Sequence, residues 1–197
     1  INEEGDVYSP YLSHDGLTLV FASTRQGSIG ANDLWICKRP VLDAPFSKPE
    51  NLGPNVNTTE EDSTPSLSND ALTLWFCAFR PDESQQVDLY EASRPSTNVP
   101  FSQANRLTGS INGPGNDFFP RPAFADRVMF FTVNNEGEQH LYYARRQNMK
   151  VPFGKPRPFV FGNDMGLVGT VAVSADGQMV VYDSEHATGK GGFDLWL

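Results

Sequence analysis

An internal repeat of about 55 residues constrains the fold of this chain more than any other feature of its sequence. Its first marker is a proline, which steps by 55 residues from Pro10 to Pro65 and again to Pro120. A second marker, a polar residue followed by Leu and an aromatic residue, begins at Asp33, Asp88, His140 and Asp194. A third marker, Pro-Phe, begins at Pro45, Pro100 and Pro152. Three markers that keep one register exclude a chance match and predict four repeated units.

Each repeat is typical of four short strands. The first strand leads into a tight turn such as Ser13-His14-Asp15-Gly16, where Asp can bind its own backbone and Gly tolerates a positive φ. The second strand, for example Leu17–Ala22, is apolar on both faces, as expected inside a stack of sheets. A polar loop such as Thr24–Asn32 precedes the third strand, and the outer strand is expected near Glu50–Asn55. Four strands in roughly 50 residues match the size of a β-propeller blade.

We therefore expect an all-β fold, a β-propeller of four-stranded antiparallel blades, in a single domain over residues 1–197. Blades must stack around an axis because one sheet alone cannot bury both faces. A β-sandwich would not predict a marker repeated at fixed spacing. The units are expected at approximately 1–56, 57–111, 112–163 and 164–197. Because the fourth unit stops within its third strand, we expect a segment of a larger propeller, with a closed four-bladed ring as the alternative.

Composition narrows the classes of partner. The chain carries 15 Lys and Arg against 24 Asp and Glu, a formal net charge of −9. This acidic balance argues against nucleic acid and anionic membrane surfaces as partners, because both require a positive field. No apolar run reaches the roughly 18–20 residues of a membrane-spanning helix. Two cysteines are too few for a disulfide scaffold or a four-Cys zinc site, so we expect Cys37 and Cys77 to be buried free thiols.

The stretch from Ser13 to Arg25 reads as a Ser-x-Asp-Gly turn, an apolar strand and a Ser-x-Arg, and the segment from Gly189 to Trp196 is a Gly-rich loop ending in Asp-Leu-Trp. These features resemble the WD40-like PD40 repeats of TolB-type propellers. The resemblance implies a periplasmic, secreted or surface-anchored bacterial propeller that binds proteins or glycans, and it implies no reaction. The same turn also resembles the Asp box of sialidase-type propellers, but Gly directly follows Asp15 and no aromatic residue follows Thr18.

Acidic residues recur at the start of the first strand and arginines after the second, on the face where the longest polar loops are expected. We expect the ligand-binding residues to be Asp6, Glu61, Asp62, Asp117, Arg25 and Arg80. The carboxylates could hold Ca²⁺ or a basic segment of a partner, and the arginines could bind carboxylates or sugar acids. In the alternative interpretation, each Asp caps backbone amides and each Arg pairs with Asp6 or Asp62 of a neighbouring blade. We expect Asp33, Asp88 and Asp194 to tie the Gly-rich loops to the blades.

These patterns favour a non-catalytic binding module that presents a loop-built face to a protein or glycan partner, with Ca²⁺ as the one cofactor considered. The alternative is an extracellular carbohydrate-active enzyme, a glycoside hydrolase or lyase, with catalytic carboxylates among Asp6, Asp62 and Asp117. An enzyme should hold a carboxylate of raised pKa in a deep pocket, whereas a binding module should pair its carboxylates with arginine. The three histidines have no metal-ligand spacing, and no Gly-x-Ser-x-Gly nucleophile elbow is present.

Overall fold

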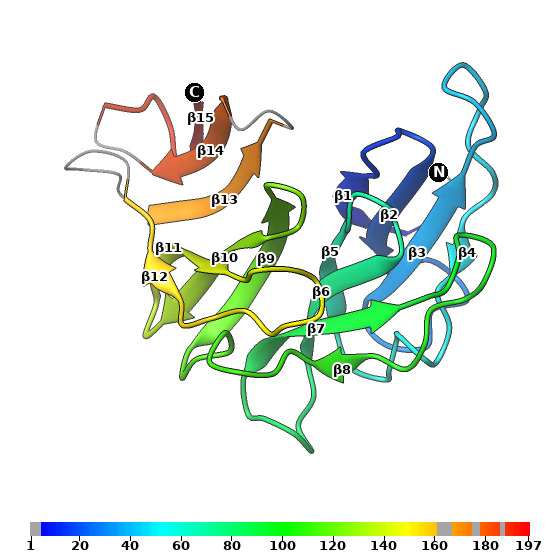
Figure 1. Ribbon diagram of the computed structural model, residues 1–197, viewed down its shortest axis with the longest axis horizontal. Coiled ribbons are helices and arrows are strands. Elements are labelled where there is room, and N and C mark those ends of the chain that lie inside the picture. The colour runs from blue at the N-terminus through cyan, green and yellow to red at the C-terminus, as the bar shows by residue number, and fades with distance from the viewer. Residues whose placement is uncertain (1–4, 161–166, 175–177, 186–187) are drawn as a thin grey trace. The chain divides into compact units, whose positions relative to one another are not determined.

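Every regular element in the described residues is a β-strand. The computed structural model describes residues 5–160, 167–174, 178–185 and 188–197 (Figure 1). Its strands form four antiparallel sheets, and within each sheet the strands pair with their neighbours in chain order. The expected all-β propeller fold of antiparallel blades is confirmed. In the part of the chain that the structure describes, we find no helical segment with the length and hydrophobicity that crossing a bilayer requires.

The chain divides into two compact units, Ile1–Arg106 and Leu107–Leu197. The N-terminal unit holds two four-stranded sheets, formed by β1 (Val7–Leu12), β2 (Thr18–Ser23), β3 (Asp33–Lys38) and β4 (Glu50–Asn51), and by β5 (Asp62–Leu67), β6 (Thr73–Phe79), β7 (Val87–Ser93) and β8 (Asn105–Arg106). The C-terminal unit holds β9 (Asn116–Ala123), β10 (Val128–Asn135), β11 (Glu138–Arg145) and β12 (Arg157–Pro158) in one sheet, and β13 (Leu167–Val173), β14 (Val180–Glu185) and β15 (Asp194–Trp196) in the other.

A β-bulge explains the proline marker. The pairing of the first strand with the second shifts register just before each marker proline in the three sheets that carry one. The residue preceding the proline has a positive φ, of 47° at Ser9, 50° at Thr64 and 53° at Phe119. Proline cannot donate to a strand ladder, and a bulge is a place where a ladder bond is already missing. The bulge therefore recurs with the 55-residue spacing.

Side chains of Ser and Asp hold the turn between the first and second strands. Ser13 Oγ donates to Asp15 Oδ1 over 2.6 Å, and Ser68 Oγ donates to Asp70 Oδ1 over the same distance. Gly16 has a φ of 72°, a conformation that glycine adopts at little cost. The turn chemistry that the sequence predicts is therefore confirmed in both sheets of the N-terminal unit.

The two sheets of the N-terminal unit bury a common apolar core. Val20 and Leu34 of the first sheet belong to the same buried cluster as Phe76 and Tyr90 of the second. The opposite face of the first sheet is also apolar, because Phe21 packs there with Trp35 and Cys37. The C-terminal unit has its own cluster, built on Val128, Phe130, Leu141, Val168 and Val171. Cys37 and Cys77 are buried free thiols, as expected.

Gly30 lies where the loop before β3 meets the segment before β5. A parallel bridge between Asn32 and Glu61 brings these two segments together. A Cβ at Gly30 would lie 2.4 Å from the carbonyl oxygens of Thr58 and Glu60. These are backbone atoms, so they cannot move aside as the end of a flexible side chain would.

We therefore expect Gly30→Ala to lower the free energy of unfolding by about 1–3 kcal/mol, because overpacking forces the backbone to shift. Chemical denaturation measures the difference. Gly113→Ala is the control, since a Cβ there meets no atom within 4 Å and its effect should stay within about 0.5 kcal/mol. Equal stability of the two variants would contradict the close approach at Gly30.

Candidate functional site

The strand register places Asp6 one position away from the other two leading aspartates. Asp62 pairs with Ala78 and Asp117 with Val133, at the start of β5 and within β9. The corresponding pairing in the first sheet joins Val7 to Ser23. Val7 therefore occupies the position of Asp62, and Asp6 occupies that of Glu61. Aligning Asp6 with Asp62 requires a one-residue gap that the backbone does not contain.

Asp62 is fully buried and forms an ion pair with Arg80. Its Oδ1 accepts a hydrogen bond from Arg80, and its Oδ2 accepts the Thr58 N–H over 2.8 Å. Arg80 also donates to the carbonyl oxygen of Val56 over 3.2 Å. Both partners belong to one sheet, β5 and the end of β6, rather than to neighbouring blades. The pair holds the segment that enters β5 against the end of β6.

Two opposing effects act on the Asp62 carboxyl. Burial raises its pKa from the ordinary 3.8 to about 6, while Arg80 and the Thr58 N–H act to lower it. The guanidinium of Arg80 also lies over the ring of Tyr90, 5.1 Å from its centroid. Tyr90 in turn donates its hydroxyl to Glu83 over 3.1 Å, and burial together with this bond raises the pKa of Tyr90. The cluster is a continuous polar network at the edge of the N-terminal core.

Asp117 makes the same local contact as Asp62. It is fully buried, and it accepts the N–H of Gly113, four residues earlier, over 3.1 Å. The Thr58–Asp62 bond spans the same four residues. Asp62 and Asp117 therefore both accept a nearby backbone amide, as the capping interpretation describes. Each carboxylate fixes the segment that leads into the first strand of its sheet.

The other three predicted site residues, Asp6, Glu61 and Arg25, are more open to solvent. Asp6 and Glu61 are exposed. A hydrogen bond to the Asp6 carboxylate raises the pKa of Tyr8. Arg25 is partly buried, and its guanidinium lies 4.9 Å from the Phe21 ring centroid and 5.2 Å from that of Trp35. The six predicted residues therefore fall into two groups. Asp6, Glu61 and Arg25 have solvent-accessible side chains, whereas the side chains of Asp62, Asp117 and Arg80 form hydrogen bonds with backbone groups.

The expected loop ties are observed at Asp33 and Asp194. Asp33 accepts the N–H groups of Ile29 and Gly30 over 2.7 and 3.0 Å. Asp194 accepts the Lys190 N–H over 2.7 Å. Asp88 is fully buried and accepts both Nε and Nη2 of Arg106, each over 2.8 Å, so it also ties the outer strand to the sheet.

A repeated arginine after the third strand was missed by sequence reasoning. Arg39, Arg94 and Arg146 each donate from Nε to a carbonyl oxygen of the turn between the first two strands of their sheet. Each guanidinium also lies over the phenylalanine of the Pro-Phe marker, at 4.6, 4.3 and 4.2 Å from the ring centroid. The signal was present, since these arginines keep the 55- and 52-residue spacing of that marker.

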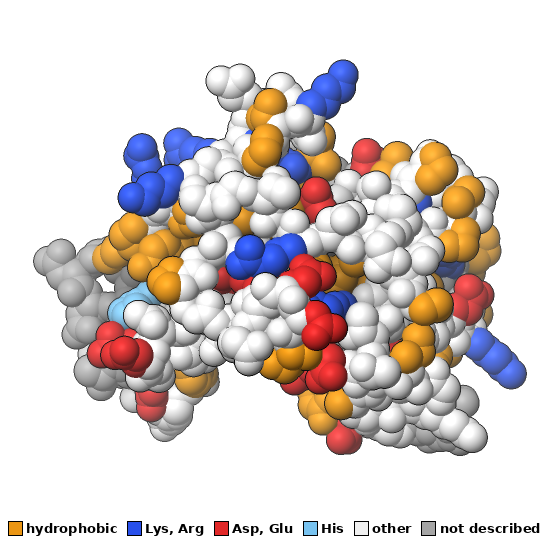
Figure 2. Space-filling view, turned by 90° about the horizontal axis from the view of Figure 1, so that it is seen from below, with side chains coloured by type: hydrophobic (Ala, Val, Ile, Leu, Met, Phe, Trp, Pro, Cys, Tyr) orange, Lys and Arg blue, Asp and Glu red, His pale blue; other side chains and the backbone are white. Residues whose placement is uncertain are grey.

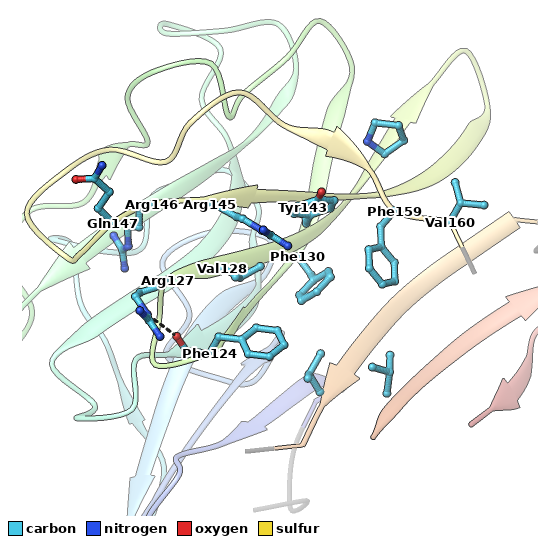
Figure 3. A pocket seen from close by; sticks show the side chains of 13 residues that line it. Phe124, Arg127, Val128, Phe130, Tyr143, Arg145, Arg146, Gln147, Phe159 and Val160 are labelled. Carbon is cyan, nitrogen blue, oxygen red and sulfur yellow. Dashed lines mark hydrogen bonds between the residues drawn. The ribbon is translucent and has the colours of Figure 1, made fainter. Parts of the chain in front are cut away.

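An aromatic pocket of about 830 Å³ lies within the C-terminal unit (Figure 3). Its walls come from β10, β11 and the residues after β12, together with Val173 and Val180 of the last sheet. The rings of Phe130 and Tyr143 stand nearly perpendicular to that of Phe159, with centroids 5.2 and 5.9 Å away. Three arginines line its rim, namely Arg127, Arg145 and Arg146. Among the described residues that line this pocket there is no Asp or Glu.

The pocket is not on the predicted loop face. Phe124 and Arg127 belong to the turn between the first and second strands, and Gln147 to the loop between the third and fourth. In an antiparallel sheet these connections share one end, opposite the connection between the second and third strands. In this sheet that last connection is short, from β10 at Asn135 to β11 at Glu138, so it offers little surface.

Metal-ligating side chains do not gather in the described residues. No group of three or more His, Cys, Asp or Glu side chains lies close enough there to hold an ion. Glu3 and Glu4, which the sequence places on the expected acidic face, lie outside the described residues. The Ca²⁺ expectation therefore gains no support from the geometry of Asp62 and Asp117.

The fold and its blade geometry define a β-propeller, and comparison with solved structures refines this class. No protein-family model and no curated protein matches the sequence. TolB from Acinetobacter baumannii superimposes with a TM-score of 0.66 at 16% identity, over 97% of this chain and 41% of that one. The putative TolB from Agrobacterium tumefaciens gives 0.64 at 16% identity, over 98% and 57%. The expected resemblance to TolB-type propellers is confirmed for the fold.

Enzymes share this fold as well. An exo-1,5-α-L-arabinanase from a bovine ruminal metagenomic library superimposes with a TM-score of 0.62 at 14% identity, over 96% of this chain and 72% of that one. The chain spans less than two thirds of the length of both TolB proteins. At these identities the likeness shows the fold alone, and function has to be argued from the residues.

Asp62 should make stability depend on pH. Because its folded pKa is about 6, the folded chain keeps a proton that the unfolded chain loses between about pH 4 and pH 6. The stability from this group is present below about pH 4 and is lost as the pH rises to about 6, by up to about 3 kcal/mol. Denaturant titrations of the wild type and Asp62→Asn at pH 4 and pH 7 measure this decline, which the variant should lack.

Asp43→Asn, at an exposed aspartate, is the matched control and should keep the wild-type decline. A wild type that gains stability from pH 4 to pH 6 through Asp62 would show that Arg80 outweighs burial.

Arg94 and Arg39 make the same kind of hydrogen bond to a turn carbonyl, but Arg94 is more deeply buried. Arg94 is buried and donates to Ala71 O from both Nε and Nη2, over 3.0 and 2.8 Å. Arg39 is less buried and donates once to Gly16 O, over 2.8 Å. We expect Arg94→Ala to cost about 3 kcal/mol and Arg39→Ala about 1 kcal/mol, because an orphaned buried carbonyl adds to the lost stacking. Chemical denaturation of both variants tests this order, and equal losses would contradict it.

Proposed function

We propose that this chain is a non-catalytic binding module whose propeller blades hold a recognition surface for a protein or glycan partner. The observation that carries this proposal is the pocket of the C-terminal unit, whose lining in the described residues consists of aromatic, aliphatic and basic side chains without a carboxylate. Such a lining supplies contact area and charge but no general acid or base for glycoside cleavage. Rigid sheets keep this lining in place, as a recognition surface requires.

The buried carboxylates support the same proposal. A general acid must deliver its proton to a bound substrate, within hydrogen-bond reach of the leaving group. Asp62 instead accepts hydrogen bonds from Arg80 and from the Thr58 N–H, and Asp117 accepts the Gly113 N–H. We infer that both are positioning residues. The exposed Asp6 and Glu61, with Arg25, are proposed as further partner contacts in the N-terminal unit.

The TolB-like fold supports the proposed periplasmic, secreted or cell-surface location. The cysteines are compatible with an oxidising compartment, because both are buried and burial raises the pKa of Cys77 to about 11. A thiol with that pKa is protonated at neutral pH and reacts slowly, since the thiolate is the nucleophile. The partner itself is proposed as a protein or glycan, without nucleic acid.

A carbohydrate-active enzyme is the second candidate function. The fold likeness to an arabinanase favours it, and so does the raised pKa of Asp62, which is a property of catalytic acids. The Arg80 ion pair opposes it, because it holds Asp62 in a buried structural contact. The two functions therefore differ in what Asp62 does.

Turnover measurements separate these functions. We expect no release of reducing sugar from arabinan, and no cleavage of a nitrophenyl α-L-arabinofuranoside, above the rate of a protein-free blank. Asp62→Asn should be indistinguishable from the wild type in this assay, although less stable. An active arabinanase serves as the positive control. Turnover by the wild type that falls by about a thousandfold in Asp62→Asn would replace the binding module with the enzyme.

A further inference from the structure

Three pockets of the C-terminal unit share lining residues beside β12, and we refer to the three together as the groove. Tyr143, Arg145 and Pro158 line both the first pocket and a second of about 670 Å³. Pro158, Phe159 and Val160 line both the first pocket and a third of about 330 Å³. The groove follows β11 from Arg145 to His140, five residue steps of an extended strand or about 17 Å. This length suits a chain-like ligand rather than a single small molecule.

The groove is basic although the protein is acidic. In the described part of the chain its lining holds five cationic side chains, from Arg127, Arg145, Arg146, Lys155 and Arg157, and no Asp or Glu. Residues 139–163 contain five Lys or Arg and no acidic residue, in a chain of net charge −9. Figure 2 shows Lys and Arg side chains gathered beside hydrophobic ones toward the upper left of that view. A local cluster of one sign creates a positive field that attracts an anion.

Three of the five groove cations differ from the arginines that hold the fold together. Arg80 and Arg106 pair with buried aspartates, whereas Arg145, Lys155 and Arg157 are exposed and form no salt bridge with a carboxylate of the described residues. Their charges therefore stay available to a ligand. A guanidinium binds a carboxylate through two parallel hydrogen bonds, which gives orientation as well as attraction.

Aromatic rings lie beside Arg145 (Figure 3). The guanidinium of Arg145 is 5.1 Å from the ring centroid of Tyr143, and Phe159 packs edge-on to the same ring. The phenylalanine of the adjoining turn, Phe124, is 46% exposed. The faces of such rings carry partial negative charge and attract the slightly positive C–H faces of a sugar ring. A lining that combines cations with aromatic rings matches a chain of sugars that carry carboxylates.

We propose that this groove binds an acidic polysaccharide, a chain of sugar rings bearing carboxylates. Arg145 and Arg157 bind the carboxylates, and Tyr143 and Phe159 contact the sugar faces. This inference rests on the proposed binding function and names the ligand class of the same surface. A purely acidic peptide could pair with the cations, but it has no sugar rings to contact Tyr143 and Phe159.

Calorimetric titration of the full chain with three probes tests the ligand class. Oligogalacturonate carries both sugar rings and charge, its fully methyl-esterified form keeps the rings without the charge, and poly-glutamate keeps the charge without the rings. We expect oligogalacturonate to bind at least about tenfold tighter than either of the other probes. Its affinity should also fall as salt is added, because the contacts are between exposed charges.

Variants locate the site. Arg145→Gln and Arg157→Gln should each weaken oligogalacturonate binding about tenfold, the effect of losing one charged hydrogen-bonding partner. Lys48→Gln, at an exposed lysine of the N-terminal unit, is the matched control and should leave the affinity unchanged. Thermal melts confirm that each variant is folded, and Lys155→Gln replaces any variant that is not.

Four outcomes would overturn the inference. Equal binding of the methyl ester would remove the role of charge, and equal binding of poly-glutamate would assign the groove to acidic peptides. Unchanged affinity in both arginine variants would place binding elsewhere. The absence of binding by oligogalacturonate would exclude the ligand class. Failure of the proposed function is distinct, because it would appear as turnover in the arabinan assay, whatever the result of the titration.

Discussion

The connections between strands depend on aspartates that accept the backbone amide of the residue four positions earlier, and three of the four, Asp33, Asp62 and Asp117, are fully buried. The bond recurs from Ile29 to Asp33, from Thr58 to Asp62, from Gly113 to Asp117 and from Lys190 to Asp194. A buried carboxylate loses its hydration, so it stabilises the fold only where several donors replace the water. Arg80 and Arg106 supply such donors to Asp62 and Asp88. Acidic residues that accept these hydrogen bonds have a structural role.

The same position can be filled differently from sheet to sheet without loss of the fold. Asp33 accepts Asn51 Nδ2 over 2.6 Å at the place where Asp88 accepts Arg106. Val7 occupies the place of Asp62 and supplies no carboxylate to Arg25, the equivalent of Arg80. The aromatic contact is kept, because Arg25 lies over Trp35 as Arg80 lies over Tyr90. The repeat therefore conserves geometry rather than one set of charges.

The sequence predicted the features that local chemistry determines. Strand order, the Asp-containing turns and the buried cysteines follow from propensity, turn residues and apolar runs, and the structure has them. The sequence groups Asp6 with Asp62, but the backbone keeps a strict 55-residue step between these sheets, as the bulge residues Ser9 and Thr64 show, so Asp6 lies one position before the place of Asp62. The aromatic groove was missed because the residues of its main pocket, on β10, β11 and the segments around β12, lie outside the three repeat markers.

The groove also shows what net charge can and cannot predict. A sum over the chain counts a carboxylate equally whether it faces solvent or is buried against an arginine. Asp33, Asp62, Asp88 and Asp117 have no exposed surface, and neighbouring donors offset much of their outward field. Arg145 and Arg157 are exposed and without such partners among the described residues. At physiological ionic strength exposed charges act over roughly 8–10 Å. A ligand that approaches the groove is therefore attracted by these cations and is little affected by the net charge of the whole chain.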